Sequence, residues 1–208
     1  MTDGILFLWF AWLLWIVVTF LMKKGKRRTY FACLLLLLIA CSNVTLEIGG
    51  YLIQLSFIVL LVGLLFFHAI AKSFYLLFSS FTICLGYTAI LFWEKITPIW
   101  IFIPRSVLIP TVIIVLTIII TKQFESRLAI GLIGITCGEM YYSFILSNYA
   151  IQEGIGDKSF FDMLLTFVLF VTLLEVLQQG KIAIYALSQD FKQSMRKQKG
   201  LTQQTKNG

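Results

Sequence analysis

The chain has 208 residues, of which 59% are hydrophobic and 13% charged, with a mean hydropathy of +0.91 and a formal net charge of +7. A soluble domain of this size cannot bury so much apolar surface, because its exterior must also be covered by polar groups. The basic residues fall between apolar runs and not on a foldable polar surface, which excludes a nucleic-acid-binding domain. Composition therefore predicts an all-α integral membrane protein whose surroundings are the lipid bilayer.

Seven apolar runs follow one another along the chain, and a membrane-spanning helix needs about 20 such residues. They cover residues 4–22, 30–47, 51–70, 74–93, 99–121, 128–148 and 160–179, the second fading from Asn43 onward. The fifth run is interrupted by Pro104, Arg105 and Pro110. We therefore predict a polytopic transmembrane bundle of seven spans within residues 1–180.

The distribution of positive charge predicts the orientation of these spans. Asp3 precedes the first run and a basic block, residues 23–28, follows it, which is the reverse of a cleaved secretory signal. With the N-terminus outside and the C-terminus in the cytoplasm, 14 of the 17 basic residues lie on the cytoplasmic side, and only Lys95, Arg105 and Lys158 lie outside. This asymmetry obeys the positive-inside rule and predicts a multi-pass protein of the cytoplasmic membrane.

Residues 181–208 form a basic, polar tail that we expect to be disordered after about residue 200. Its apolar residues Ile184, Leu187, Phe191 and Met195 recur at intervals of three and four, which is the spacing of one helical face. Three interpretations stay open: a continuation of the seventh helix into water, a helix on the lipid surface, and a docking site for a cytoplasmic partner. At the other end of the seventh run, Ser159 and Asp162 have the spacing of a capping box.

An ionisable side chain inside a membrane span is expensive to bury and is therefore a candidate functional group. Glu139 lies deep in the sixth run, Glu175 lies nearer the cytoplasmic end of the seventh, and Arg105 lies near the outer end of the fifth. Glu175 shares a helical stripe with Thr172 and Gln179, and Gln54 is a further polar residue in the third run. We expect these polar groups to face one another inside the bundle, either as hydrogen-bonding contacts between helices or as a site coupled to protons or a solute.

Three glycines in the sixth run, Gly131, Gly134 and Gly138, form a narrow stripe that contains a GxxxG pair. Small residues let a neighbouring helix approach the backbone closely. The stripe therefore predicts a helix-packing surface beside Glu139.

Motifs for catalysis, cofactors or metals are weak. The sequence Gly154-Ile155-Gly156-Asp157 matches the GxGD motif of intramembrane aspartyl proteases, but it falls in a predicted outer loop, and no span supplies a second aspartate. Two glycines and an aspartate before a helix are typical of a turn. The four cysteines have no CxxC spacing, which gives no support to a zinc site. We expect no enzymatic activity, no catalytic or metal-binding residues and no cofactor.

The chain resembles the YphA family of small polytopic membrane proteins from spore-forming Bacillus-type bacteria. The resemblance rests on the opening run Trp9-Phe10-Ala11-Trp12-Leu13-Leu14-Trp15, the basic block at 23–28, and the seven-span layout with a short basic tail. It implies a cytoplasmic-membrane protein linked to sporulation or the spore envelope, and it transfers no active-site residues. Our leading hypothesis is a non-enzymatic membrane component that acts through protein or helix contacts. The alternatives are a small transporter or channel that uses Glu139 and Glu175, and a membrane enzyme acting on lipid or envelope precursors.

Overall fold

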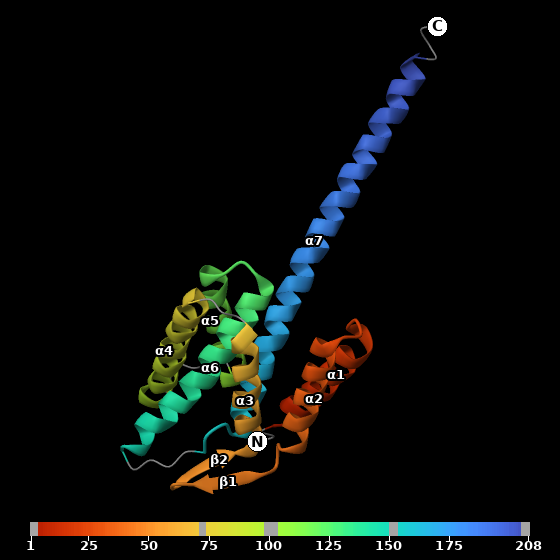
Figure 1. The fold of residues 1–208 in the computed structure, drawn as a ribbon. Coiled ribbons are helices and arrows are strands. Elements are labelled where there is room, and N and C mark those ends of the chain that lie inside the picture. The colour runs from red at the N-terminus through yellow and green to blue at the C-terminus, as the bar shows by residue number, and fades with distance from the viewer. Residues whose placement is uncertain (1–3, 71–73, 98–103, 150–153, 205–208) are drawn as a thin grey trace. The chain divides into compact units, whose positions relative to one another are not determined.

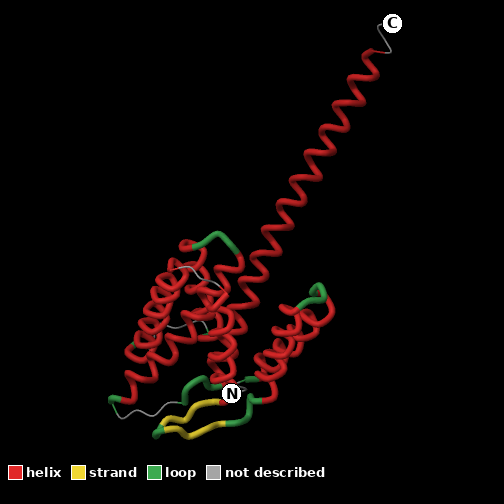
Figure 2. Tube along the Cα trace, in the orientation of Figure 1, coloured by secondary structure: helices red, strands yellow, loops and turns green. Residues whose placement is uncertain are grey.

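The computed structural model describes residues 4–70, 74–97, 104–149 and 154–204, and contains helices and one small sheet in these residues (Figure 1, Figure 2). The elements are α1 (Ile5–Leu21), α2 (Lys26–Ala40), β1 (Thr45–Ile48), β2 (Tyr51–Gln54), α3 (Leu55–Ile70), α4 (Phe74–Ile96), α5 (Arg105–Ile120), α6 (Phe124–Ser147) and α7 (Lys158–Gln204). The all-α class is confirmed, with seven helices in the described part. The chain divides into two compact units, residues 1–171 and 172–208.

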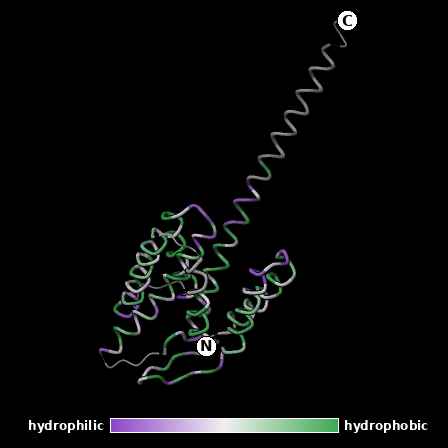
Figure 3. The backbone as a smooth tube through the Cα atoms, viewed as in Figure 1, coloured by the Kyte–Doolittle hydropathy of each residue, from purple (hydrophilic) through white to green (hydrophobic). Residues whose placement is uncertain are grey.

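Several helices are apolar over most of their length, as the hydropathy colouring of Figure 3 shows. Among the described residues, three are long and apolar enough to cross a membrane: Phe74–Ile96, Phe124–Ser147 and Lys158–Lys181. Shorter apolar helices cover Leu6–Leu21, Leu55–Leu64 and Arg105–Ile120. Helices of 16 or 17 residues rise only about 24–26 Å, somewhat less than a hydrocarbon core of about 30 Å.

In the first unit, the most extensive contact between helices is that of α4 with α6, and α5 packs on both of these helices. Helix α1 packs on α2, α2 packs on α3, and α3 also contacts α6. Large side chains fill the space between the elements, among them Phe57, Tyr87, Ile113 and Phe167, all nearly inaccessible to solvent.

The expectation that the third span begins at residue 51 is wrong. Tyr51–Gln54 is a strand that pairs antiparallel with Thr45–Ile48, and the helix begins only at Leu55. Gly49 and Gly50 form the turn with φ values of 60° and 85°, a left-handed conformation that glycine adopts without steric cost. Gly-Gly directly after the alternating residues Thr45–Ile48 is a hairpin signal, which the apolar run that begins at Tyr51 obscured.

Other helix ends differ from the apolar runs because polar residues can extend a helix beyond its apolar part. Helix α2 begins at Lys26, before the apolar run, and ends at Ala40; helix α6 begins at Phe124. Long basic side chains in a first turn can direct their charge into the aqueous interface while the backbone stays helical. The start of the predicted fifth span, up to residue 103, lies outside the described residues.

The predicted capping box at Ser159 is also wrong. Helix α7 starts at Lys158, and the Asp157 carboxylate accepts a 2.8 Å hydrogen bond from the backbone N–H of Phe160. An acidic side chain just before a helix satisfies one of the N–H groups that have no partner within the helix. Asp157, one residue before the helix begins, therefore takes the role that we expected of Ser159.

The second unit is the continuation of α7, which the structure assigns as helix through Gln204. Helix thus extends slightly beyond residue 200, where we expected disorder to begin. Ile184 of the predicted apolar stripe is exposed. The side chains of Leu187, Phe191 and Met195 lie outside the described residues.

Candidate polar site between α4 and α6

Two glycines of α6 bring its backbone against α4. A Cβ atom added to Gly134 would lie 2.7 Å from the Ile83 Cβ and 2.9 Å from the Ser80 carbonyl oxygen. A Cβ atom on Gly138 would lie 2.6 Å from Tyr87 Cδ1 and 3.1 Å from a backbone oxygen of α4. Real Cβ contacts are longer than this, so the observed separation of the two helices requires glycine at both positions.

The close approach of the two helices places Tyr87 of α4 beside Glu139 of α6. The Tyr87 hydroxyl donates a 2.6 Å hydrogen bond to Glu139 Oε2, and both side chains are buried, with Glu139 only 5% exposed. Glu139 lies eight residues before the end of α6, which corresponds to about 12 Å of helix rise. A buried carboxyl group needs such a donor, because removing it from water without compensation is costly.

Thr88, the next residue of α4, adds a polar contact at the same level. Its hydroxyl lies 2.8 Å from the Cys84 carbonyl oxygen on its own helix and 3.3 Å from the Gly138 carbonyl oxygen on α6. Hydroxyl groups that bond a carbonyl of their own helix or of a neighbouring helix are common in membrane bundles. The buried polar groups here are thus matched to one another across the interface.

An ion pair lies at the end of α4. Arg105, the first residue of α5, places its Nε 3.3 Å from Glu94 Oε2, with both side chains partly exposed. The Arg105 charge also interacts with Tyr87 and Glu139 at longer range. Arg105 and Glu139, both singled out from the sequence, therefore belong to one electrostatic neighbourhood made by α4, α5 and α6.

The other two candidate residues have different surroundings. Gln54 ends β2 and is buried, and its side-chain amide donates to the carbonyl of Ser42. Glu175 belongs to the second unit, where its carboxylate accepts a 3.0 Å hydrogen bond from the Gln179 side chain one turn further along α7. The polar stripe predicted on α7 is thus hydrogen-bonded within its own helix. Gln54 belongs to the hairpin region.

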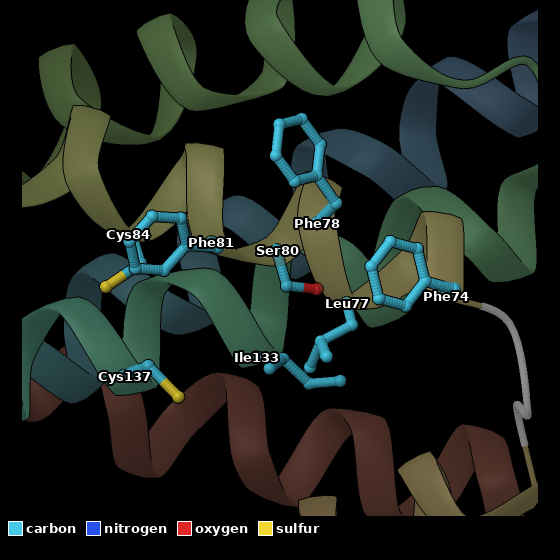
Figure 4. Close-up of a pocket in the computed structure, with 8 residues that line it drawn as sticks. All are labelled: Phe74, Leu77, Phe78, Ser80, Phe81, Cys84, Ile133 and Cys137. Atoms are coloured by element: carbon cyan, nitrogen blue, oxygen red, sulfur yellow. The ribbon is translucent and has the colours of Figure 1, made fainter.

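An open cavity of about 380 Å³ lies beside this interface, lined by apolar side chains, two thiols and the hydroxyl of Ser80 (Figure 4). Phe74, Phe78, Phe81 and Cys84 come from α4, and Ile133 and Cys137 come from α6. A smaller cavity of about 130 Å³ is lined by residues of α1, the hairpin region and α7, including Gln54. Glu139 lines neither of these two cavities.

A family profile described as YphA-like integral membrane protein matches residues 3–200. The chain belongs to this YphA-like family. It is 26% identical to the uncharacterized protein YphA of Bacillus subtilis (strain 168) over 156 residues, which cover 71% of this chain and 75% of that protein. No solved structure matches the chain. The family resemblance drawn from the sequence is confirmed, and the YphA-like chain is an integral membrane protein that lies in a lipid bilayer.

One structural contact of a buried carboxylate was missed by sequence reasoning. Asp162 is buried in α7, and its two carboxylate oxygens accept hydrogen bonds from the backbone N–H groups of Gly4 at 2.9 Å and Phe7 at 2.6 Å. A carboxylate at a helix N-terminus satisfies free N–H groups and interacts favourably with the helix dipole. Asp162 therefore caps α1, a helix more than 150 residues away in sequence, and no local pattern could have identified that partner.

Arg127 is a second residue whose role sequence reasoning missed, since we counted it only as a cytoplasmic flanking charge. It is 2% exposed, and its Nη2 donates a 3.2 Å hydrogen bond to the Thr121 carbonyl oxygen. Its Nε and Nη1 atoms are buried without a hydrogen-bond partner. The burial of the Arg127 side chain depends on how α5 and α6 pack, which the sequence does not reveal.

Proposed function

We propose that this YphA-like protein is a non-enzymatic, multi-pass component of the cytoplasmic membrane that acts through contacts with other membrane proteins. The observation that carries the proposal is that Glu139 is buried and hydrogen-bonded within the protein. Its carboxylate is bonded to Tyr87 inside a glycine-packed helix pair and lines neither of the two cavities described above. A carboxylate that moved a solute or a proton would need an accessible path.

The topology that we propose has seven spans with the N-terminus outside. Contacts between helix ends support an alternating path through the bilayer. At one end, Arg27 at the start of α2 lies 3.6 Å from Glu125 at the start of α6, and the Tyr75 hydroxyl at the start of α4 donates to the carbonyl oxygen at the end of α5. At the other end, Asp162 bonds the start of α1, and Arg105 pairs with Glu94. The basic side chains concentrated at the first of these ends support its assignment to the cytoplasm.

Short spans are compatible with this topology. Helices α1, α2, α3 and α5 have 15 to 17 residues, but flanking basic side chains can reach the interface, and the bilayer can thin locally at modest cost. Lys26, Arg27 and Arg28 in the first turn of α2 are suited to this role.

We propose that the GxGD sequence is a turn and not a catalytic motif, and that the protein is not an enzyme stays a prediction. Gly156 has a positive φ of 69°, and Asp157 caps α7. These residues have structural tasks in a turn and at a helix start. A link to sporulation or the spore envelope stays a prediction from the family resemblance.

The alternative function is a small transporter or channel in which Glu139 and Glu175 bind the transported species. One observation is compatible with it: a partly exposed ion pair, Arg105 with Glu94, lies at the end of α4, the helix whose Tyr87 bonds Glu139. The two functions predict different partners, since transport needs a solute and the membrane component needs a second protein.

The experiment is site-specific photo-crosslinking in cells, combined with deletion phenotyping. A photo-reactive residue is placed at the exposed positions Trp9, Phe78 and Ile119, and at the buried position Ile113 as a control. We expect one exposed face to give a discrete protein adduct that the control does not give. Lipid adducts alone at every exposed position, together with a deletion phenotype that depends on a solute, would contradict our proposal and favour transport.

A further inference from the structure

The β1–β2 hairpin has one apolar face. Its register pairs Leu46 with Ile53 and Ile48 with Tyr51, and successive side chains in a strand point to opposite faces. These four side chains therefore share one face. Thr45, Glu47 and Gln54 lie on the opposite face together with Leu52.

Contacts fix the hairpin at the level where a long apolar helix ends. The Tyr51 hydroxyl lies 2.7 Å from the hydroxyl of Ser147, the last residue of α6. Helix α3 begins directly after β2, and backbone hydrogen bonds join β2 to Ile155. Helix α6 has 24 residues and rises about 36 Å, so it extends past a hydrocarbon core of about 30 Å. Its end and the attached hairpin therefore lie at the boundary of the bilayer.

The apolar face is covered less by protein on β1, its outer strand, than on β2. Tyr51 and Ile53 are half-buried, whereas Leu46 is 37% exposed and Ile48 is 53% exposed. Within the described residues β1 pairs only with β2, so β1 is also the free edge of the sheet. An exposed apolar strand with a free edge in water invites aggregation.

We propose that the hairpin lies flat in the lipid headgroup region, with Leu46 and Ile48 inserted toward the acyl chains and Glu47 facing water. The lipid is the expected occupant because the face is continuous with the end of a membrane span and carries Tyr51, an interfacial residue type. Residues 42–55 contain one acidic side chain and no basic one, so attraction to anionic headgroups is not the driving force. Insertion rests on apolar burial and is independent of lipid charge.

The leaflet follows the proposed topology, which places the hairpin outside the cell. The test below uses nanodiscs, in which both leaflets are accessible. Its result therefore does not depend on the topology or on the proposed function.

The experiment measures the depth of single nitroxide labels in full-length protein in nanodiscs. Leu46→Cys and Ile48→Cys report the apolar face, and Thr45→Cys and Glu47→Cys are matched controls from the same strand, all in a background in which the four native cysteines are replaced. We expect the ratio of oxygen to water-soluble nickel-complex collisions to be severalfold higher at 46 and 48 than at 45 and 47. The pattern should be the same in zwitterionic and in anionic nanodiscs.

Three outcomes would overturn the proposal. Equal exposure of all four labels to the nickel complex would place the hairpin in water. Protection of positions 46 and 48 from both reagents would show that protein covers the face, either a second copy or a partner. Loss of the alternating pattern in zwitterionic lipid alone would make the binding electrostatic. Size-exclusion profiles of the variants matched to the unsubstituted background protein exclude misfolding as the cause of any of these results.

Discussion

Tyr87 of α4 donates a 2.6 Å hydrogen bond to Glu139 of α6 inside an interface that two glycines keep close. Tyr87→Phe removes the donor and leaves a buried carboxylate oxygen without that bond. Side-chain hydrogen bonds between membrane helices contribute about 1–2 kcal/mol or less, so we expect a loss of that size in the free energy of unfolding in mixed micelles. Tyr141→Phe, on the exposed side of the same helix α6, is the control and should leave stability unchanged. Equal effects of the two substitutions on the free energy of unfolding would mean that the hydrogen bond from Tyr87 makes no net contribution to stability.

Two substitutions at Glu139 separate a structural role from a proton-coupling role. Glu139→Gln keeps a hydrogen-bond acceptor for Tyr87 and removes the ionisable group, so we expect it to complement a deletion strain almost fully. Glu139→Leu removes the acceptor as well and should lower stability, because the Tyr87 hydroxyl then stays buried without that acceptor. Loss of complementation by Glu139→Gln in a protein that is stable and present at normal levels would support coupling to protons.

Gly134→Ala tests the close approach of α4 and α6. The added Cβ would collide with Ile83 and with the backbone oxygen of Ser80, neither of which can move without shifting α4. Overpacking of this kind costs about 1–3 kcal/mol, measured as a drop in unfolding free energy. The matched control is Gly86→Ala on α4, where an added Cβ meets only Leu116 at an ordinary 3.5 Å. A destabilising Gly86→Ala with a tolerated Gly134→Ala would reverse our assignment of the interface.

The sequence predicted the elements that depend on local composition and missed those that depend on contacts across the fold. Long apolar runs located α4 and α6 because lipid requires continuous apolar helices. The glycine stripe predicted a packing surface, but the partner residues Ile83 and Tyr87 are fixed only by the arrangement of α4 on α6. The hairpin carried a local signal in Gly49-Gly50, which a hydropathy criterion does not register.

Asp162 should stabilise the start of α1, because its carboxylate accepts hydrogen bonds from Gly4 and Phe7. Asp162→Ala leaves these N–H groups without a partner, and loss of such a cap costs about 0.5–2 kcal/mol. We expect faster amide hydrogen exchange in the first turn of α1, with little change in α4. Asp157→Ala is the control: it should speed exchange at the start of α7 and leave α1 unaffected. Unchanged exchange at Phe7 in the Asp162 variant would contradict the capping role.

The final prediction concerns the orientation of the whole chain. Single cysteines at Thr2, Gly154 and Gly208 are introduced after the native Cys33, Cys41, Cys84 and Cys137 are replaced, and intact cells are treated with a membrane-impermeant thiol reagent. The positive-inside rule places 14 of the 17 basic residues in the cytoplasm when the N-terminus is outside, so the first two positions should be labelled and the third should not. Permeabilised cells provide the control, since all three positions should then react. Labelling of position 208 in intact cells would place the C-terminus outside the cell. Protection of position 154 would mean that the loop before α7 is not outside. Either result would require a different number of spans.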